Sequence, residues 1–182
     1  IALRFYPEWG IGIWTLTIGA AVSHAIQAAM ADHYRQFHLF FVNGKGGSEL
    51  DDSESVAHDY RSISFKAEPV RKLSLWFYWH YTKVQETFNP QMTRLRVCLR
   101  LQSGESLSPT ISELVGHATL PLMKWTNVLT YNWRAITLFV SILVQRPWLY
   151  LICELSVFNV IMLYMVIRHE HICKTIYKNI NI

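Results

Sequence analysis

The sequence is poor in charged residues and in cysteine. Only 16% of its 182 residues are charged, whereas about 25% is usual for a soluble domain. The three cysteines, Cys98, Cys153 and Cys173, are far apart and form no Cys-x-x-Cys pair, which argues against a disulfide scaffold and a zinc ribbon. No internal repeat, low-complexity tract or secretory signal peptide is visible. The sequence starts with Ile1 rather than methionine, so we expect a fragment or a processed product.

Hydrophobic residues, by contrast, make up 51% of the chain and are concentrated in segments. Three segments approach the roughly 20 apolar residues that cross a bilayer: residues 11–31, 128–144 and 148–167. A turn at Gln145–Pro147 would join the last two as an antiparallel hairpin. The sequence therefore predicts an all-α integral membrane helical bundle fragment, a single membrane domain over residues 1–182 with about three transmembrane helices.

The long middle region, residues 32–124, is predicted to be a mostly helical insertion. Helices are expected over residues 73–86 and 92–101, with breaks at residues 43–48, 88–90 and 103–109. The first helix contains an aromatic cluster at residues 76–81, which fits either a helix at the lipid headgroups or a contact with the rest of the protein.

The distribution of lysine and arginine predicts the orientation. Eleven of these residues lie between Asp32 and Lys124, and three follow Ile167. Positively charged segments favour the cytoplasmic side. We therefore expect a multi-pass protein of the inner (cytoplasmic) membrane whose insertion and C-terminus are cytoplasmic.

Polar residues within or beside the apolar segments are candidates for a site, because burying them in a bilayer is unfavourable. His24 and Gln27 are three residues apart, and Arg35 continues their helical face. Asn127 and Arg134 are expected to share a face of the second span, where a guanidinium would suit a phosphate. Two interpretations remain open: these residues line a substrate cavity, or they form structural pairs, with Arg134 bound to Glu154 of the third span.

Several short stretches resemble functional motifs but lack the residue spacing that those motifs require. The Gly44–Gly47 stretch lacks the glycine and the Ser or Thr of a phosphate-binding loop, so a flexible turn is expected. His169 and His171 would point to opposite sides of a helix and could not bind one metal ion. Asp51 and Asp52 read as a solvated acidic turn. No catalytic residue, metal ligand or nucleic-acid partner is therefore predicted within this chain.

Four long strings carry a resemblance to a known family: ADHYRQFHLFFVNGKGGSELDDS, LPLMKWTNVLTYNWRAITLFVS, PWLYLICELSVFNVIMLYMV and RHEHICK. They resemble the C-terminal part of bacterial CDP-alcohol phosphatidyltransferases, in the form common in Bacteroidetes. The resemblance implies a membrane enzyme of phospholipid biosynthesis that transfers a phospho-alcohol group from a CDP-alcohol to a lipid or alcohol acceptor and releases CMP. Such enzymes are usually dimers, so a homodimer is implied as well.

The resemblance also implies magnesium, which the aspartates of a signature Asp-Gly-x2-Ala-Arg-x8-Gly-x3-Asp-x3-Asp hold in that family. Neither Asp-Gly nor Ala-Arg occurs in this sequence. We therefore expect the magnesium ligands to lie outside this chain and the chain alone to be inactive. Its contribution would be a cavity wall that contains His24, Gln27, Arg35, Asn127 and Arg134. The alternative is a non-enzymatic membrane protein whose amphipathic cytoplasmic region binds lipid or a partner.

Overall fold

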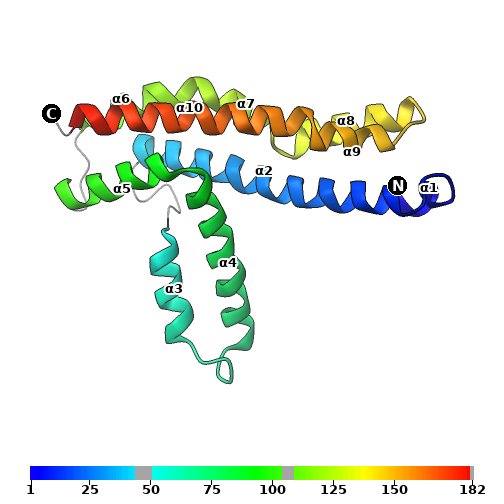
Figure 1. Ribbon diagram of the computed structural model, residues 1–182. Helices are drawn as coiled ribbons and strands as arrows, with labels where there is room; N and C mark the ends of the chain where they lie inside the picture. Colours follow the sequence, from blue (N-terminus) through cyan, green and yellow to red (C-terminus); the bar gives the residue numbers. More distant parts are fainter. Residues whose placement is uncertain (44–50, 104–108, 181–182) are drawn as a thin grey trace. The chain divides into compact units, whose positions relative to one another are not determined.

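The computed structural model describes residues 1–43, 51–103 and 109–180, and within these ranges the protein is all-helical without strands (Figure 1). The all-α prediction is therefore confirmed for the described residues. The elements are α1 (Ala2–Trp9), α2 (Ile11–Asn43), α3 (Ser53–Ser62), α4 (Pro69–Phe88), α5 (Pro90–Ser103), α6 (Pro109–Thr119), the 3₁₀ helix η2 (Leu120–Leu122), α7 (Met123–Val128), α8 (Tyr131–Leu143), α9 (Trp148–Leu155) and α10 (Val157–Ile180).

Among the described residues, two helical stretches rather than three are long and apolar enough to cross a membrane. They are Ile11–Asn43 and Trp148–Ile180, the second made of α9 and α10. The span predicted at residues 128–144 is not one continuous helix, because α7 ends at Val128 and α8 covers only 13 residues. At 1.5 Å per residue α8 is about 20 Å long, short of the roughly 30 Å of a hydrocarbon core.

The break before α8 has a local cause. Thr130 is the N-cap of α8 and has an extended backbone, with φ −86° and ψ 176°. Its amide and its hydroxyl both bond to the carbonyl oxygen of Asn127, at 3.2 and 2.5 Å, which closes a turn after α7. The extended backbone of Thr130 interrupts the helical hydrogen bonding, so a helix boundary replaces the continuous helix that the apolar pattern predicted.

The chain divides into two compact units. The first unit comprises residues 1–32 and 122–167, and the second comprises residues 33–121 and 168–182. Helices α2 and α10 each continue from one unit into the other. The divisions lie close to the predicted limits of the apolar segments, at residues 31 and 167, and of the insertion, at residue 124. The first unit thus collects the apolar segments and the second collects the predicted insertion and tail.

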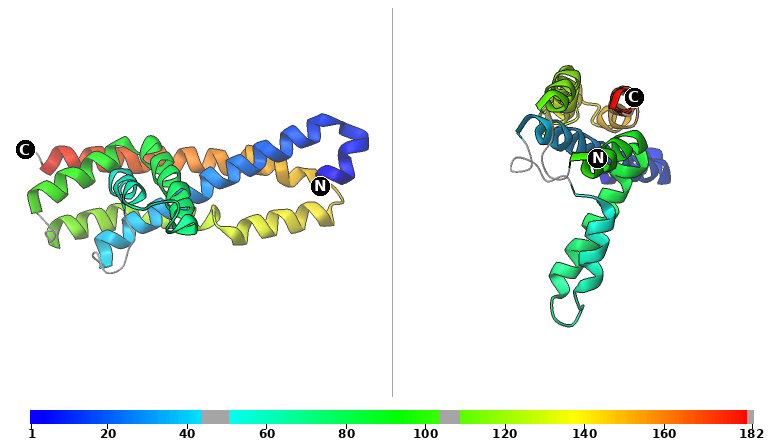
Figure 2. Two further views of the ribbon diagram at one scale, coloured as in Figure 1. Left: turned by 90° about the horizontal axis from the view of Figure 1, so that it is seen from below. Right: turned by 90° about the vertical axis from the view of Figure 1, so that its left-hand side faces the viewer.

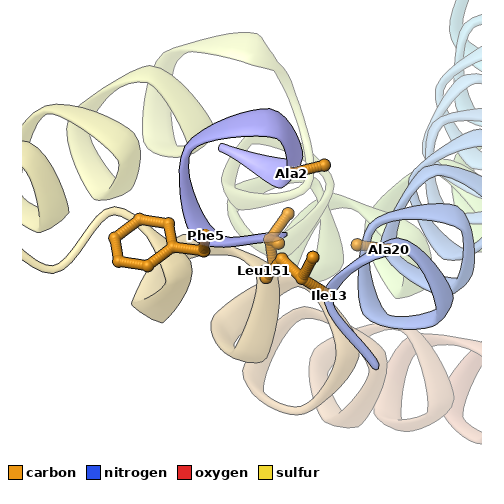
Figure 3. Packing of buried hydrophobic residues seen from close by; sticks show 5 residues of the cluster. All are labelled: Ala2, Phe5, Ile13, Ala20 and Leu151. Atoms are coloured by element: carbon orange, nitrogen blue, oxygen red, sulfur yellow. The ribbon is translucent and has the colours of Figure 1, made fainter. Parts of the chain in front are cut away.

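The core of the first unit is formed by α1, α2 and α9. Figure 3 shows Phe5 of α1, Ile13 and Ala20 of α2, and Leu151 of α9 clustered together with Ala2. Gly10 has φ 55°, a left-handed conformation that suits glycine, and it allows the chain to turn between α1 and α2.

Helices α8 and α9 form the predicted antiparallel hairpin (Figures 1 and 2). The connection contains Gln145, whose φ of 58° is unusual for a residue with a side chain, followed by Arg146 and Pro147. The outer surface of α8 is strongly apolar. Seven large hydrophobic side chains of α8 or directly after it are more than half exposed: Tyr131, Trp133, Ile136, Phe139, Ile142, Leu143 and Val144. An apolar exterior of this kind is typical of a surface covered by lipid or protein.

In the second unit, α3 and α4 lie side by side as a helical hairpin (Figure 1; Figure 2, right). Asp52 caps α3 by accepting a hydrogen bond from the Ser55 amide at 2.8 Å, so this acid has a structural role. The Glu86 carboxylate accepts hydrogen bonds from the amide and hydroxyl of Ser53, which fixes the start of α3 against α4.

The predicted helices of the insertion are confirmed, since residues 73–86 lie within α4 and residues 92–101 within α5. The break predicted at residues 88–90 is confirmed at Asn89, between α4 and α5. The glycine turn predicted within residues 43–48 and the break within residues 103–109 fall mostly at residues 44–50 and 104–108, outside the described residues.

Candidate functional site

A buried ion pair lies at the centre of the first unit's polar side chains. Arg134 projects from α8 and Glu154 from α9, and their side chains are only 4% and 1% exposed. Nη1 of Arg134 lies 2.9 Å from Oε1 of Glu154. The guanidinium also lies over the ring of Phe158, 5.6 Å from its centroid. Two opposite charges at this distance compensate each other, which is what allows both to be buried.

Gln27 of α2 connects this pair to α10. Its Oε1 accepts a hydrogen bond from Nη2 of Arg134 at 2.8 Å. Its Nε2 lies 2.9 Å from Oγ of Ser23 and 3.0 Å from both the Glu154 carbonyl oxygen and Oδ1 of Asn159. The Ser23 hydroxyl donates to the same Asn159 oxygen at 2.9 Å. Gln27 is fully buried, so its amide depends entirely on these partners.

His24 is the member of the cluster that reaches the surface, with a side chain 47% exposed. Its Nδ1 lies 3.2 Å from Oε1 of Glu154 and also contacts Nη1 of Arg134. A ring nitrogen either carries a proton or offers a lone pair, so Nδ1 can donate to Glu154 or accept from Arg134, but not both at once. His24 therefore has two alternative hydrogen-bonding states at the edge of the ion pair.

A pocket of about 320 Å³ opens beside the cluster, between α2, α8 and α9. Its apolar wall is the face of α8, and its polar groups are the side chains of His24 and Arg134 and two tyrosines. The lining residues are His24, Tyr131, Arg134, Ala135, Leu138, Phe139, Ile142 and Tyr150. A mostly apolar cavity with a few converging polar groups is the usual form of a small-molecule site.

The structure brings together three of the five residues predicted to form a site: His24, Gln27 and Arg134. Asn127 is not among them, because it lies on α7 and is exposed, and the break at Thr130 removes the helical face it was expected to share with Arg134. Arg35 is exposed in the second unit and is not part of the cluster.

The pairing of Arg134 with Glu154, one of the two interpretations left open by the sequence, is present in the structure. The charge of Arg134 is therefore already compensated. A phosphate at this place would have to compete with a carboxylate 2.9 Å away, so the guanidinium does not act as a free anion-binding group.

Sequence reasoning missed the rest of the network. Ser23 and Asn159 complete the hydrogen bonds of Gln27, and Tyr150 lines the pocket and interacts with Glu154. Asn159 could have been predicted from its position inside an otherwise apolar span, where a polar side chain needs a hydrogen-bonding partner. Ser23 could have been predicted from its spacing of four residues from Gln27 on one helical face.

A second polar group lies in the second unit and was not predicted. The ring of Tyr34 stacks on His169 with centroids 4.0 Å apart, and the Tyr34 hydroxyl donates to Oδ1 of Asn89 at 2.8 Å. His169 is fully buried whereas His171 is exposed, so the prediction that they point to opposite sides is confirmed. This arrangement locks the break between α4 and α5 against α2 and α10.

The second unit also contains a larger pocket, of about 500 Å³, between the end of α2 and α6. His38 lines it and donates from Nδ1 to Oγ1 of Thr119 at 2.7 Å, because that hydroxyl itself donates to the Val115 carbonyl. The acidic and basic side chains on its wall, Glu113 and His117, are exposed. This pocket thus has volume but no buried polar cluster to orient a ligand.

The described residues offer no site for the magnesium ion implied by the family resemblance. Within residues 1–43, 51–103 and 109–180, no three His, Cys, Asp or Glu side chains are grouped so that they could hold a metal ion. Magnesium prefers several oxygen ligands, and the one buried carboxylate of the cluster, Glu154, is occupied by Arg134.

Comparison with known proteins adds no relative: no protein-family model, no curated protein and no solved structure matches this chain.

Proposed function

We propose that this chain forms the substrate-lining, non-catalytic part of a membrane phosphotransferase that acts on a CDP-alcohol. The enzyme would transfer the phospho-alcohol group to the hydroxyl of a lipid or alcohol acceptor and release CMP, as a step of phospholipid biosynthesis. Because the sequence contains neither Asp-Gly nor Ala-Arg, the metal-binding aspartates would be supplied by polypeptide outside it. The proposal rests on the family resemblance and on the pocket beside the Arg134–Glu154 pair.

The single observation that carries the proposal is the chemistry of that pocket. One wall is the apolar face of α8, and the other end carries an imidazole, a guanidinium and two phenols. A ligand with a hydrocarbon part and a polar, hydrogen-bonding head matches this distribution. Both the lipid acceptor and the lipid-linked donor of such a reaction are ligands of that kind.

Within this proposal the residues of the cluster have different roles. Glu154 and Gln27 hold the Arg134 guanidinium in one orientation, through contacts of 2.9 and 2.8 Å. The Nε–H of Arg134 has no acceptor among the described residues. His24, half exposed at the rim, is the group best placed to contact the polar head of a ligand. Arg134 is thus a positioning residue and His24 a contact residue.

The proposed membrane arrangement follows from the apolar segments. Helix α2 and the α9–α10 stretch would each cross the bilayer, and α7 with α8, residues 123–143, would make the third membrane segment. An interrupted helix is tolerated at membrane depth where it lines a cavity, and α8 does so. The lysine and arginine distribution would place residues 33–121 and the C-terminus in the cytoplasm.

The coding sequence on the 5′ side of the codon for Ile1 provides the first test. An Asp-Gly-x2-Ala-Arg signature in the same reading frame, followed by the spaced aspartates, would support the enzyme. A start codon directly before Ile1 would contradict it. In that case the non-enzymatic alternative, a membrane protein that binds lipid or a partner through its amphipathic region, would replace it.

Kinetics of the whole protein test the role of the pocket. His24→Ala should raise the KM for the CDP-alcohol or the acceptor by roughly tenfold, because it removes a contact without unpairing Arg134 and Glu154. His58→Ala is the matched control, since His58 lies on α3 and its side chain is 85% exposed. Unchanged kinetics for His24→Ala would remove this pocket from the substrate path.

A further inference from the structure

One face of α4 is apolar and exposed although α4 is paired with α3. Val70, Leu73, Phe77 and Val84 are 78%, 52%, 59% and 36% exposed. At about 100° per residue these four positions fall within an arc of about 60° on the helix. The buried residues of α4, Thr82 and Gln85, lie on a different face. We call Val70, Leu73, Phe77 and Val84 the exposed face of α4.

Aromatic side chains border this face. Trp76 is 39% exposed and contacts the rings of Phe77 and His80, with centroids 4.9 and 4.2 Å apart. Phe65, in the turn between α3 and α4, is 63% exposed. Tryptophan with neighbouring aromatic rings is enriched where a protein meets the headgroup region of a bilayer, because the ring tolerates both apolar and polar surroundings.

The same segment is strongly basic. Between residues 60 and 84 there are five basic side chains and one acidic one, a net charge of +4 that equals the net charge of the whole chain. The one acid, Glu68, is paired with Arg71 at 3.1 Å. Lys72 and Lys83 lie over the rings of Tyr60 and Trp79, so their charges stay close to the aromatic surface. Basic side chains on either side of an apolar helix face that is bordered by aromatic rings complement an anionic surface.

We propose that the exposed face of α4 docks onto an anionic lipid bilayer, with Leu73 and Phe77 among the acyl chains and the basic side chains at the phosphates. The occupant is lipid rather than a protein partner for two reasons. The chain carries two stretches that are long and apolar enough to cross a membrane, so a bilayer surface is close at hand. The segment that contains this face, residues 60–84, also has a net charge of +4. The proposal does not depend on the chain being part of an enzyme.

A label that reports membrane depth tests the proposal in the full chain. Phe77→Cys, in a variant whose three native cysteines are replaced by alanine, is labelled with an environment-sensitive fluorophore and placed in nanodiscs. His58→Cys on α3 is the matched control, and Leu73→Cys is a second position on the same face. In discs with about one third anionic lipid, we expect spin-labelled lipid to quench position 77 at least about three times more than position 58.

The lipid composition and the salt concentration complete the test. Quenching at positions 73 and 77 should fall by about half or more in discs of neutral lipid, or in about 0.5 M salt, because charge attraction is then lost or screened. Water-like emission at both positions in anionic discs would overturn the proposal. So would equal quenching in neutral and anionic discs, or protection that appears only when a second protein is added.

A measurement without substitutions covers the case in which a labelled variant does not fold. Hydroxyl-radical modification of the unaltered protein should decrease at Trp76 and Phe77 by about threefold in anionic relative to neutral discs, and should stay unchanged at Tyr60. Equal modification of the α4 face in both lipids would contradict the docking.

Discussion

The buried pair of Arg134 and Glu154 leads to a sharp prediction about stability. Each single substitution, Arg134→Met or Glu154→Leu, leaves the other charge buried without its partner. Because the two side chains are 4% and 1% exposed, water cannot compensate for the loss. Breaking a buried pair in this way costs about 3–5 kcal/mol. We therefore expect each single variant to lose that much of the free energy of unfolding.

The double variant should be less destabilised than either single one. Replacing both partners by apolar side chains of similar volume removes the burial of two charges together with their attraction. The remaining loss is the hydrogen bond between Arg134 and Gln27, about 1 kcal/mol, together with an unsatisfied Gln27 oxygen, about 1–2 kcal/mol. The expected interaction energy from the double-mutant cycle is thus at least about 3 kcal/mol.

Unfolding in mixed detergent micelles, followed by far-UV circular dichroism, measures this cycle in the full chain. The control cycle uses Arg71→Met and Glu68→Leu, whose ion pair of 3.1 Å is 64% and 50% exposed. An exposed pair should show an interaction energy of only about 0.2–1 kcal/mol. If the losses of Arg134→Met and Glu154→Leu simply add in the double variant, the two charges do not compensate each other and the account of the cluster is wrong.

Three further predictions concern single side chains. Tyr34→Phe should cost about 1–2 kcal/mol in the same assay, because it deprives buried Asn89 of a 2.8 Å hydrogen bond while keeping the stack on His169; an unchanged midpoint would contradict this. The Glu170 carboxylate caps the start of α5 by accepting hydrogen bonds from the N–H groups of Gln91 and Met92, so Glu170→Gln should speed amide exchange at these two residues. Unchanged exchange would show that the carboxylate does not cap α5. Gln145→Gly should stabilise by about 0.5–1 kcal/mol, since φ is 58° there; a loss of stability would exclude strain at this turn.

Sequence reasoning succeeded where a single residue type imposes a local geometry. Pro147 predicted the turn between α8 and α9, and Pro90 predicted the break between α4 and α5. The spacing of His169 and His171 predicted that they would point to opposite sides of a helix, and in the structure His169 is buried while His171 is exposed. In each case the constraint acts within a few residues, so no knowledge of tertiary contacts is needed.

It failed at the break before α8 and at contacts that are distant in the chain. The apolar pattern continues through Leu129, so hydrophobicity did not reveal the local turn at which Thr130 begins a new helix. Because of this break, Asn127 does not share a helical face with Arg134 and was wrongly predicted to belong to the site. Three partners of Gln27, namely Arg134, Glu154 and Asn159, are more than 100 residues away, and helical periodicity alone does not pair one helix with another.

The most direct test of the proposed function is CMP release by the whole protein reconstituted in nanodiscs. With Mg²⁺, a CDP-alcohol and a lipid or alcohol acceptor present, the account predicts release of CMP in step with formation of the phospho-alcohol product. It also predicts that His24→Ala slows this release at subsaturating substrate while His58→Ala does not. A correctly folded protein that releases no CMP from any CDP-alcohol would contradict the account.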